Sequence, residues 1–172
     1  MLVTGIIANS ITVAVGEAVK LDSSGFVTNA TASTAVLGVC VGFCDASFVP
    51  LAPSAYAAGT ATSSDVQSVA AASDNQTVAL KRALIEASKD KVWSVSVNGT
   101  LGTTNSSPTA VGRIGGYVDV DSSGTNYARV LETTFERADG TDQNFFCWGV
   151  DAADTTRLLV SIANSVTLAS AA

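Results

Sequence analysis

The feature that most constrains the fold is a succession of short β-prone runs, each ended by a turn rich in Gly, Asn or Asp. Residues 11–15 alternate with a bias toward β-branched side chains, and Gly16 breaks the run. Similar runs continue along the chain, whereas apolar residues at helical spacing are nearly absent. This pattern predicts a mainly β protein, an antiparallel β-sandwich or barrel with an N-terminal β-hairpin region and a long loop.

The first hairpin is predicted around the sequence Asp-Ser-Ser-Gly at residues 22–25. Gly25 would supply the positive φ that closes such a loop, and the Asp22 carboxylate can accept a hydrogen bond from a turn amide. The same four residues recur at 121–124 between two further alternating runs. They predict a second hairpin, although one tetrapeptide is too short to establish an internal repeat.

The remaining runs predict one central strand and several others. Residues 36–44 are apolar on both faces, which indicates a strand covered on both sides. Residues 77–87 would also fit one face of a helix, but no capping box precedes them and an alternating strand at 93–97 follows at once, which favours a strand. Further strands are expected at 117–120, 127–135, 143–150 and 157–162.

By pattern the chain divides into three regions. Residues 1–48 are the N-terminal hairpin and strand region, residues 49–76 a loose loop, and residues 77–172 a C-terminal sandwich or barrel. All three could equally form one compact domain, because 172 residues is an ordinary length for a single core. Long loops are uncommon in compact domains unless they serve binding, so the middle region is predicted to be a contact arm.

Charge and composition exclude several classes of function. Charged residues make up 14% of the chain, against about 25% in average proteins, and the formal net charge is −6. Nine scattered basic residues argue against a nucleic-acid partner, which needs clustered Lys and Arg. No apolar stretch reaches membrane-spanning length, and residues 1–7 lack a basic leader, so we expect cytoplasmic synthesis and no membrane partner.

The chain offers little for catalysis, so we expect no enzyme, no metal and no cofactor. It contains no histidine, no nucleophile elbow, no phosphate loop and no Cys-x-x-Cys motif. Cys40 and Cys44 would lie about 13 Å apart along a strand, so we expect buried free thiols, with an intermolecular bridge through Cys147 as the alternative. Carboxylate pairs are predicted to cap turns, with a surface cation site as the alternative: Asp119 and Asp121, Asp139 and Asp142, and Asp151 and Asp154.

Aromatic side chains gather in the second half of the chain and indicate a β core there. We expect Phe146 and Trp148 to lie on opposite faces of one strand, one in the core and the other at a subunit interface. The apolar segment from Leu2 to Asn9 is predicted either to add to a neighbour as an edge strand or to join its own sheet. The candidate interface residues are Leu2, Val3, Ile6, Ile7, Phe48, Leu51, Tyr56 and Trp148.

Two stretches of the sequence resemble known virion proteins. Residues 16–27, Gly-Glu-Ala-Val-Lys-Leu-Asp-Ser-Ser-Gly-Phe-Val, together with Val-Leu-Gly-Val at 36–39, resemble the opening of capsid decoration (cement) proteins of tailed bacteriophages. The stretch from Gly99 to Ile162 is similar to larger cement-type structural proteins of marine and freshwater phages. Neither stretch carries a catalytic motif.

The resemblance implies a β-rich subunit, made in the host bacterial cytoplasm, that binds the outer capsid surface of a virion. Its partners would be the major capsid protein and further copies of itself, with a trimer favoured over a dimer. Two other classes stay open. One is a carbohydrate- or cell-surface-binding β-sandwich that stacks sugars on Trp93 or Trp148, and the other is a different virion component, a head fibre or tail tube.

Overall fold

Every regular element in the described part of the chain is a β-strand. The structure, a computed structural model, describes residues 1–9, 11–52, 68–70, 82–98, 115–121, 129–131, 143–154 and 156–165. Its strands are β1 (Leu2–Ile6), β2 (Thr12–Ala14), β3 (Ala18–Leu21), β4 (Val27–Asn29), β5 (Gly38–Cys44), β6 (Ser68–Ala70), β7 (Arg82–Glu86), β8 (Trp93–Asn98), β9 (Gly116–Val118), β10 (Arg129–Leu131), β11 (Phe145–Val150) and β12 (Arg157–Ile162). Within these ranges no helix could span a membrane.

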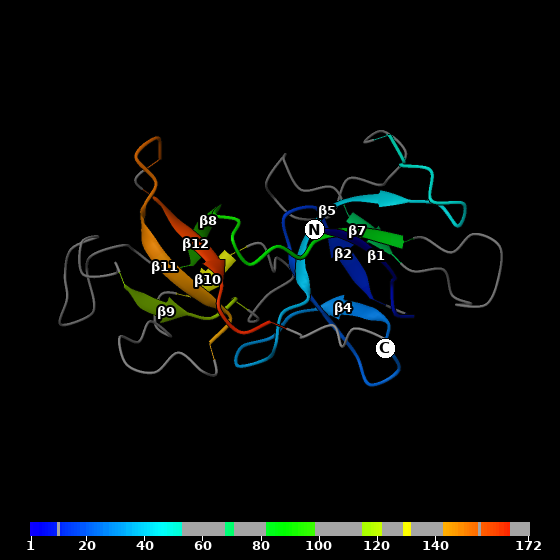
Figure 1. Ribbon diagram of the computed structural model, residues 1–172, viewed down its shortest axis with the longest axis horizontal. Helices are drawn as coiled ribbons and strands as arrows, with labels where there is room; N and C mark the ends of the chain where they lie inside the picture. Colours follow the sequence, from blue (N-terminus) through cyan, green and yellow to red (C-terminus); the bar gives the residue numbers. More distant parts are fainter. Residues whose placement is uncertain are drawn as a thin grey trace.

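The strands form two lobes that lie side by side along the long axis of the molecule (Figure 1). The first lobe holds a five-stranded sheet of order β1-β7-β5-β3-β4, and β2 pairs with β6 nearby. The second lobe holds a five-stranded sheet of order β10-β8-β12-β11-β9. Neighbouring strands are antiparallel except β8 and β10, which run parallel. The predicted mainly β class is confirmed.

The first sheet is strongly curled into a half-barrel, and its two edge strands, β1 and β4, come into contact at one end. Beyond the end of β1, Ile7 bridges to Val27 of β4, and the Ala8 amide donates to the Val27 carbonyl over 2.8 Å. Gly5 lies so close to this contact that a Cβ would collide with a Val27 methyl group. Apolar side chains fill the interior, among them Phe43 and Ile85, which have no exposed surface.

The second sheet packs one face on a core that reaches into the first lobe. Val118 and Val160 from the second sheet belong to the same buried cluster as Ala18, Ala30 and Val36 from the first lobe. Because one apolar cluster draws on both lobes, separating them would expose it to water.

The predicted first hairpin is confirmed. β3 and β4 pair antiparallel, and Asp22 Oδ1 accepts the amides of Ser24 and Phe26 at 2.8 and 2.9 Å. Gly25 has the expected positive φ, 81°. At the second Asp-Ser-Ser-Gly, Val120 and Val130 form an antiparallel bridge as a hairpin requires, while the turn itself lies outside the described residues.

Two further predictions concern the middle of the first sheet. β5 is the third of five strands and six of its seven residues are buried, which confirms a central strand. The ambiguous segment is a strand over residues 82–86, as favoured, and residues 77–81 lie outside the described part. Because Ala83 and Ile85 of β7 pack into the half-barrel, the first lobe reaches residue 86 and does not end at the predicted division at 77.

Asn144, which has no exposed surface, joins the two lobes by hydrogen bonds. Its side-chain amide donates to the Thr34 carbonyl at 2.6 Å and to the Thr31 carbonyl at 3.3 Å, both in the first lobe. Its side-chain oxygen accepts the Val120 amide of the second lobe at 2.9 Å. Donor and acceptor of one side chain are therefore satisfied by opposite lobes, as a buried amide requires.

Asp119 and a backbone bridge reinforce the same junction. Asp119 Oδ1 accepts hydrogen bonds from the backbone amide of Ser33 in the first lobe at 3.0 Å and from the backbone amide of Asn144 at 3.1 Å. A few residues further along, the Val36 amide donates to the Asn164 carbonyl over 2.8 Å. The loop of residues 31–36 is thus fixed to the second sheet by contacts at both of its ends.

Replacing Asn144 by Ala should lower the free energy of unfolding by about 2 to 4 kcal/mol, because buried backbone groups of both lobes would lose their partners. Chemical denaturation of the full chain measures this. Asn9→Ala is the matched control, since Asn9 is exposed and its loss should change the value by about 0.5 kcal/mol or less. Equal stability of the two variants would contradict this role of Asn144.

Candidate functional site

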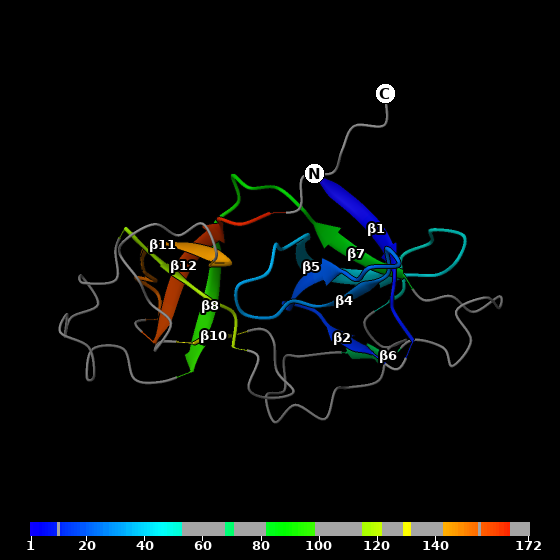
Figure 2. The ribbon, with the colours of Figure 1, turned by 90° about the horizontal axis from the view of Figure 1, so that it is seen from below.

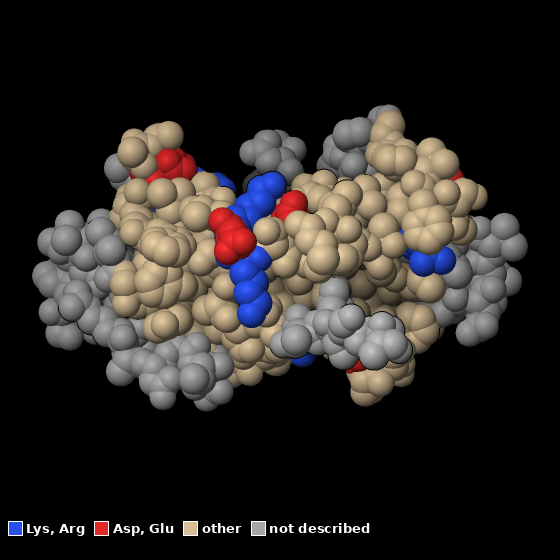
Figure 3. All heavy atoms as spheres, in the orientation of Figure 1, with Lys and Arg blue, Asp and Glu red and all other residues tan. Residues whose placement is uncertain are grey.

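Seven large apolar side chains of the described residues are at least 40% exposed, and they gather at a few places. They are Met1, Leu2, Val41, Phe48, Val49, Val92 and Trp148. Figure 2 shows that β1 and β7 of the first lobe and β11 and β12 of the second lie toward the same side of the molecule. Figure 3 faces that side, and its described atoms are mostly uncharged, with charged atoms gathered mainly where the lobes meet.

The predicted interface residues of the N-terminal segment divide between surface and core. Leu2 is 59% exposed, Val3 and Ile6 are partly buried, and Ile7 is buried in the half-barrel. β1 pairs with β7, so the segment joins its own sheet, one of the two predicted outcomes. Ile7 cannot reach a partner, whereas Leu2 at the sheet edge can.

Three aromatic side chains form a ladder on the outer face of the second sheet. The rings of Tyr117 and Phe146 are 5.3 Å apart and those of Phe146 and Trp148 are 4.9 Å apart, both edge to face. The prediction that Phe146 and Trp148 lie on opposite faces is wrong, because residues two apart along a strand point to the same side. The core side of β11 is served by Phe145 and Cys147, which are both buried.

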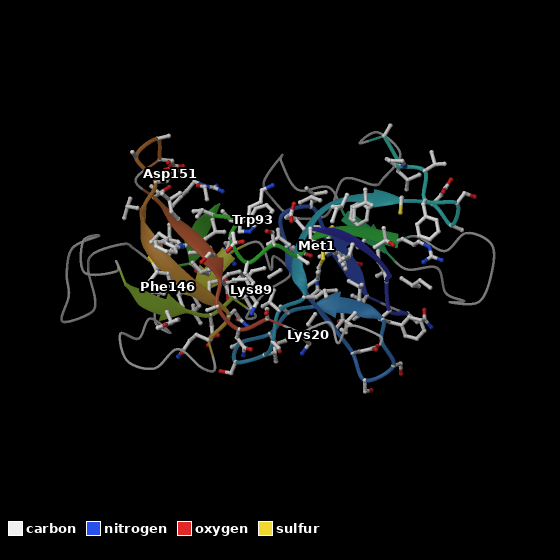
Figure 4. All side chains as sticks on the ribbon, in the orientation of Figure 1. Met1, Lys20, Lys89, Trp93, Phe146 and Asp151 are labelled. Atoms are coloured by element: carbon white, nitrogen blue, oxygen red, sulfur yellow. The ribbon has the colours of Figure 1, made fainter. Side chains whose placement is uncertain are left out.

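Trp148 is the one exposed tryptophan of the two in the sequence. The residue is 55% exposed, and its indole Nε1 donates to Ser161 Oγ at 2.9 Å, which fixes the orientation of the ring. Trp93 instead packs against the core of the second lobe. Figure 4 shows Phe146 on β11, Asp151 beyond the end of that strand and Trp93 nearer the junction of the lobes.

Beside the ladder lies a polar network whose hydrogen bonds are internal. The Arg157 guanidinium donates to Ser94 Oγ at 2.8 Å, to Ser96 Oγ at 3.0 Å and to the Ser94 carbonyl at 2.6 Å. The Ser94 hydroxyl donates to Asp151 Oδ2 at 2.6 Å. This bond, followed by one from the Ala153 amide, holds the pKa of Asp151 below its ordinary value. The network thus ties β8 to β12 and to the turn that follows β11.

Phe48 lies at the tip of a tight turn that follows β5. Asp45 Oδ1 accepts the amides of Ser47 and Val49 at 2.8 and 3.0 Å. Phe48 has a φ of 64° and is 58% exposed, and Cζ of Arg82 lies 4.8 Å from the centroid of its ring. The turn therefore presents an aromatic side chain outward from a hydrogen-bonded frame.

Of the other two residues predicted in the loose segment, one is placed. Leu51 is partly buried and packs against the core of the half-barrel, so it anchors the base of the turn. Tyr56 lies outside the described residues.

The cysteines and carboxylates behave as structural groups. All three thiols are free and buried, and burial raises the pKa of Cys40 to about 12. Cys147 has no exposed surface, so the alternative of a bridge between subunits does not fit. Asp151 and Asp154 cap the β11–β12 turn by accepting the Ala153 and Thr156 amides, while Asp139 and Asp142 lie outside the described residues. No metal-ligating cluster occurs in the part described.

No protein-family model matches the chain, and neither a curated protein nor a solved structure shows significant similarity to it. What the chain does must therefore be inferred from its own surfaces. Those surfaces are the exposed end of β1, the Phe48 turn and the aromatic ladder of residues 117, 146 and 148.

Replacing Ser94 by Ala should raise the pKa of Asp151 toward its ordinary value, because the bond that lowers it most would be lost. A folded-state pKa below the unfolded one stabilises the protein above the unfolded pKa, and this contribution is lost as pH falls through the folded pKa. Acidification should therefore destabilise the wild type more steeply than Ser94→Ala. Titration of the Asp151 carboxyl by NMR measures the shift.

Ser96→Ala is the matched control for this experiment. Its hydroxyl accepts a hydrogen bond from Arg157 on the same face, and Ser96 is not among the groups that lower the pKa of Asp151. The pKa of Asp151 should stay depressed in this variant. If Ser94→Ala left the pKa in place as well, the assignment of its cause would be wrong.

Proposed function

We propose that the chain is a structural virion protein, a capsid decoration protein that binds the outer surface of a phage head and stabilises contacts between major capsid proteins. The observation that carries the proposal is the presence of exposed apolar side chains on both of two firmly joined lobes. Leu2 and Phe48 lie on the first lobe and Trp148 on the second. A subunit with this arrangement can touch two neighbouring coat proteins at once.

Interface physics supports a protein partner for these surfaces. The cores of protein interfaces are depleted of charge and enriched in aromatic residues. On the side seen in Figure 3 most described atoms are uncharged, and the chain as a whole has a charged fraction of only 14%. The resemblance of residues 16–27 and 36–39 to the opening of decoration proteins points the same way.

Two modest contacts become strong when they are joined rigidly. The second contact forms within an already tethered complex, so its effective concentration is high. The hydrogen bonds of Asn144 fix the spacing of the lobes, which keeps both contacts in register with a regular shell. Association of the subunit with itself, as a trimer, would multiply this effect around a symmetry axis.

Purified full-length protein should cosediment with particles assembled from the coat protein encoded together with it. Binding should saturate at a fixed ratio of chain to coat subunit, because the sites repeat with the symmetry of the shell. Gradient centrifugation followed by quantitative gel analysis measures the ratio. Protein that stays at the top of the gradient at about 10 μM, where a Kd of μM order would give binding, would sink the proposal.

Exposed Trp148 supports a second candidate, a carbohydrate-binding face. An indole held by Ser161 and flanked by Phe146 is a flat apolar platform of the kind on which sugar rings stack. If this holds, cell-surface polysaccharide should change the tryptophan fluorescence in a saturable way. Trp148→Ala should abolish the change, whereas Trp93→Phe, which alters a partly buried residue packed against the core, should keep it. Loss in both variants or in neither would exclude stacking on Trp148.

A further inference from the structure

The Phe48 turn repeats the backbone of the first hairpin loop with one telling difference. The Asp22 amide donates to the Phe26 carbonyl at 2.8 Å and the Gly25 amide to the Asp22 carbonyl at 3.1 Å. The equivalent bonds of the second turn run from Asp45 to residue 49 at 3.0 Å and from Phe48 to Asp45 at 3.1 Å. Both aspartates also cap two amides of their own turn. Phe48 thus occupies the position of Gly25.

This position demands a positive φ, 81° at Gly25 and 64° at Phe48. Glycine adopts such a φ without steric cost, whereas a bulky side chain does so only under strain. Burial does not repay the strain at Phe48, because the side chain is 58% exposed. An exposed, strained aromatic residue is a candidate functional group, since folding alone would favour glycine here.

The surroundings of the ring support a role in docking. Val49 is 56% exposed and Pro50 is also exposed, so the tip of the turn is apolar over consecutive residues. Arg82 of β7 lies beneath the ring, and β7 pairs with β5 at Cys44, at the base of the turn. The ring is therefore carried on a sheet and not on a free loop.

Arg82 adds a polar requirement to this surface. Its Nε is buried without a hydrogen-bond partner, and within the described ranges no carboxylate forms a salt bridge with it. Arg82 as a whole is only partly buried, so a carboxylate supplied by a partner could pair with the accessible part of its guanidinium.

We propose that Phe48 is the anchor of the docking contact, inserted into an apolar pocket of the coat subunit that is bordered by a carboxylate facing Arg82. The inference rests on the proposed function and names the chemistry of its partner. A protein pocket fits this tip better than a sugar does, because Phe48, Val49 and Pro50 offer no side-chain hydrogen-bonding groups for hydroxyls.

Phe48→Gly tests the anchor, because it removes the ring and relieves the strain together. Its Tm should rise or stay within about 2 °C of the wild type, while its affinity for assembled coat particles should fall by about 30-fold or more, as expected of an interface hot spot. Arg82→Gln should weaken binding and reduce its dependence on salt, since a charge pair is lost.

Gly25→Ala is the matched control in the equivalent turn. It introduces a side chain at a φ of 81° where no other atom lies within 4 Å, so only backbone strain is added. Its Tm should fall by several degrees, while its binding to the particles should match that of the wild type. Together, Phe48→Gly and Gly25→Ala separate the effect of the positive φ on stability from the contribution of the Phe48 ring to binding.

The outcomes distinguish this inference from the proposed function. If the wild type does not bind particles, the proposed function fails; if the wild type and Phe48→Gly bind equally, only the anchor fails. A Tm of Phe48→Gly lower by more than about 5 °C would show that the ring serves folding and would overturn the anchor. A variant that binds particles normally but loses self-association, seen by analytical ultracentrifugation, would overturn it in favour of a second copy as the occupant.

Discussion

One buried side chain, Asn144, ties the two lobes together, and the rest of the arrangement depends on it. Its amide group reaches carbonyls of the first lobe, and its oxygen accepts an amide of the second. A buried amide that loses such partners raises the free energy of the folded state. Sliding one lobe against the other would break these hydrogen bonds and is therefore opposed. The relative placement of the Phe48 turn and the aromatic ladder follows from this constraint.

The short strands make the junction necessary. Several of them contain only three residues, among them β4, β9 and β10, and small sheets of this kind bury little surface by themselves. The apolar cluster shared between Val36 and the second sheet gives that sheet a larger core than its own strands supply. Polar and apolar contacts therefore act on the same loop, residues 31–36, and bind both lobes into one packed unit.

Much of the fold could be predicted because local rules govern it. The hairpin at Asp22 and the buried strand β5 each follow from a few adjacent residues. The sheet to which β7 belongs could not be predicted in this way, because its alternating pattern fits either lobe. The role of Asn144 was also hidden, since its partners in the first lobe, Thr31 and Thr34, lie more than 100 residues away along the chain. The sequence indicates Phe48 as an apolar residue in a polar segment. It gives no sign of the positive φ at Phe48, because glycine is the residue expected at such a position, as at Gly25.

We propose that this chain coats a phage capsid. Electron cryomicroscopy of virions that contain the chain, compared with virions from which its gene is deleted, tests this most directly. We expect additional two-lobed density on the outside of the shell at symmetry-related positions, with the Phe48 turn against a coat subunit. Identical shells in the two maps, or density for the chain inside the head or along the tail, would contradict it.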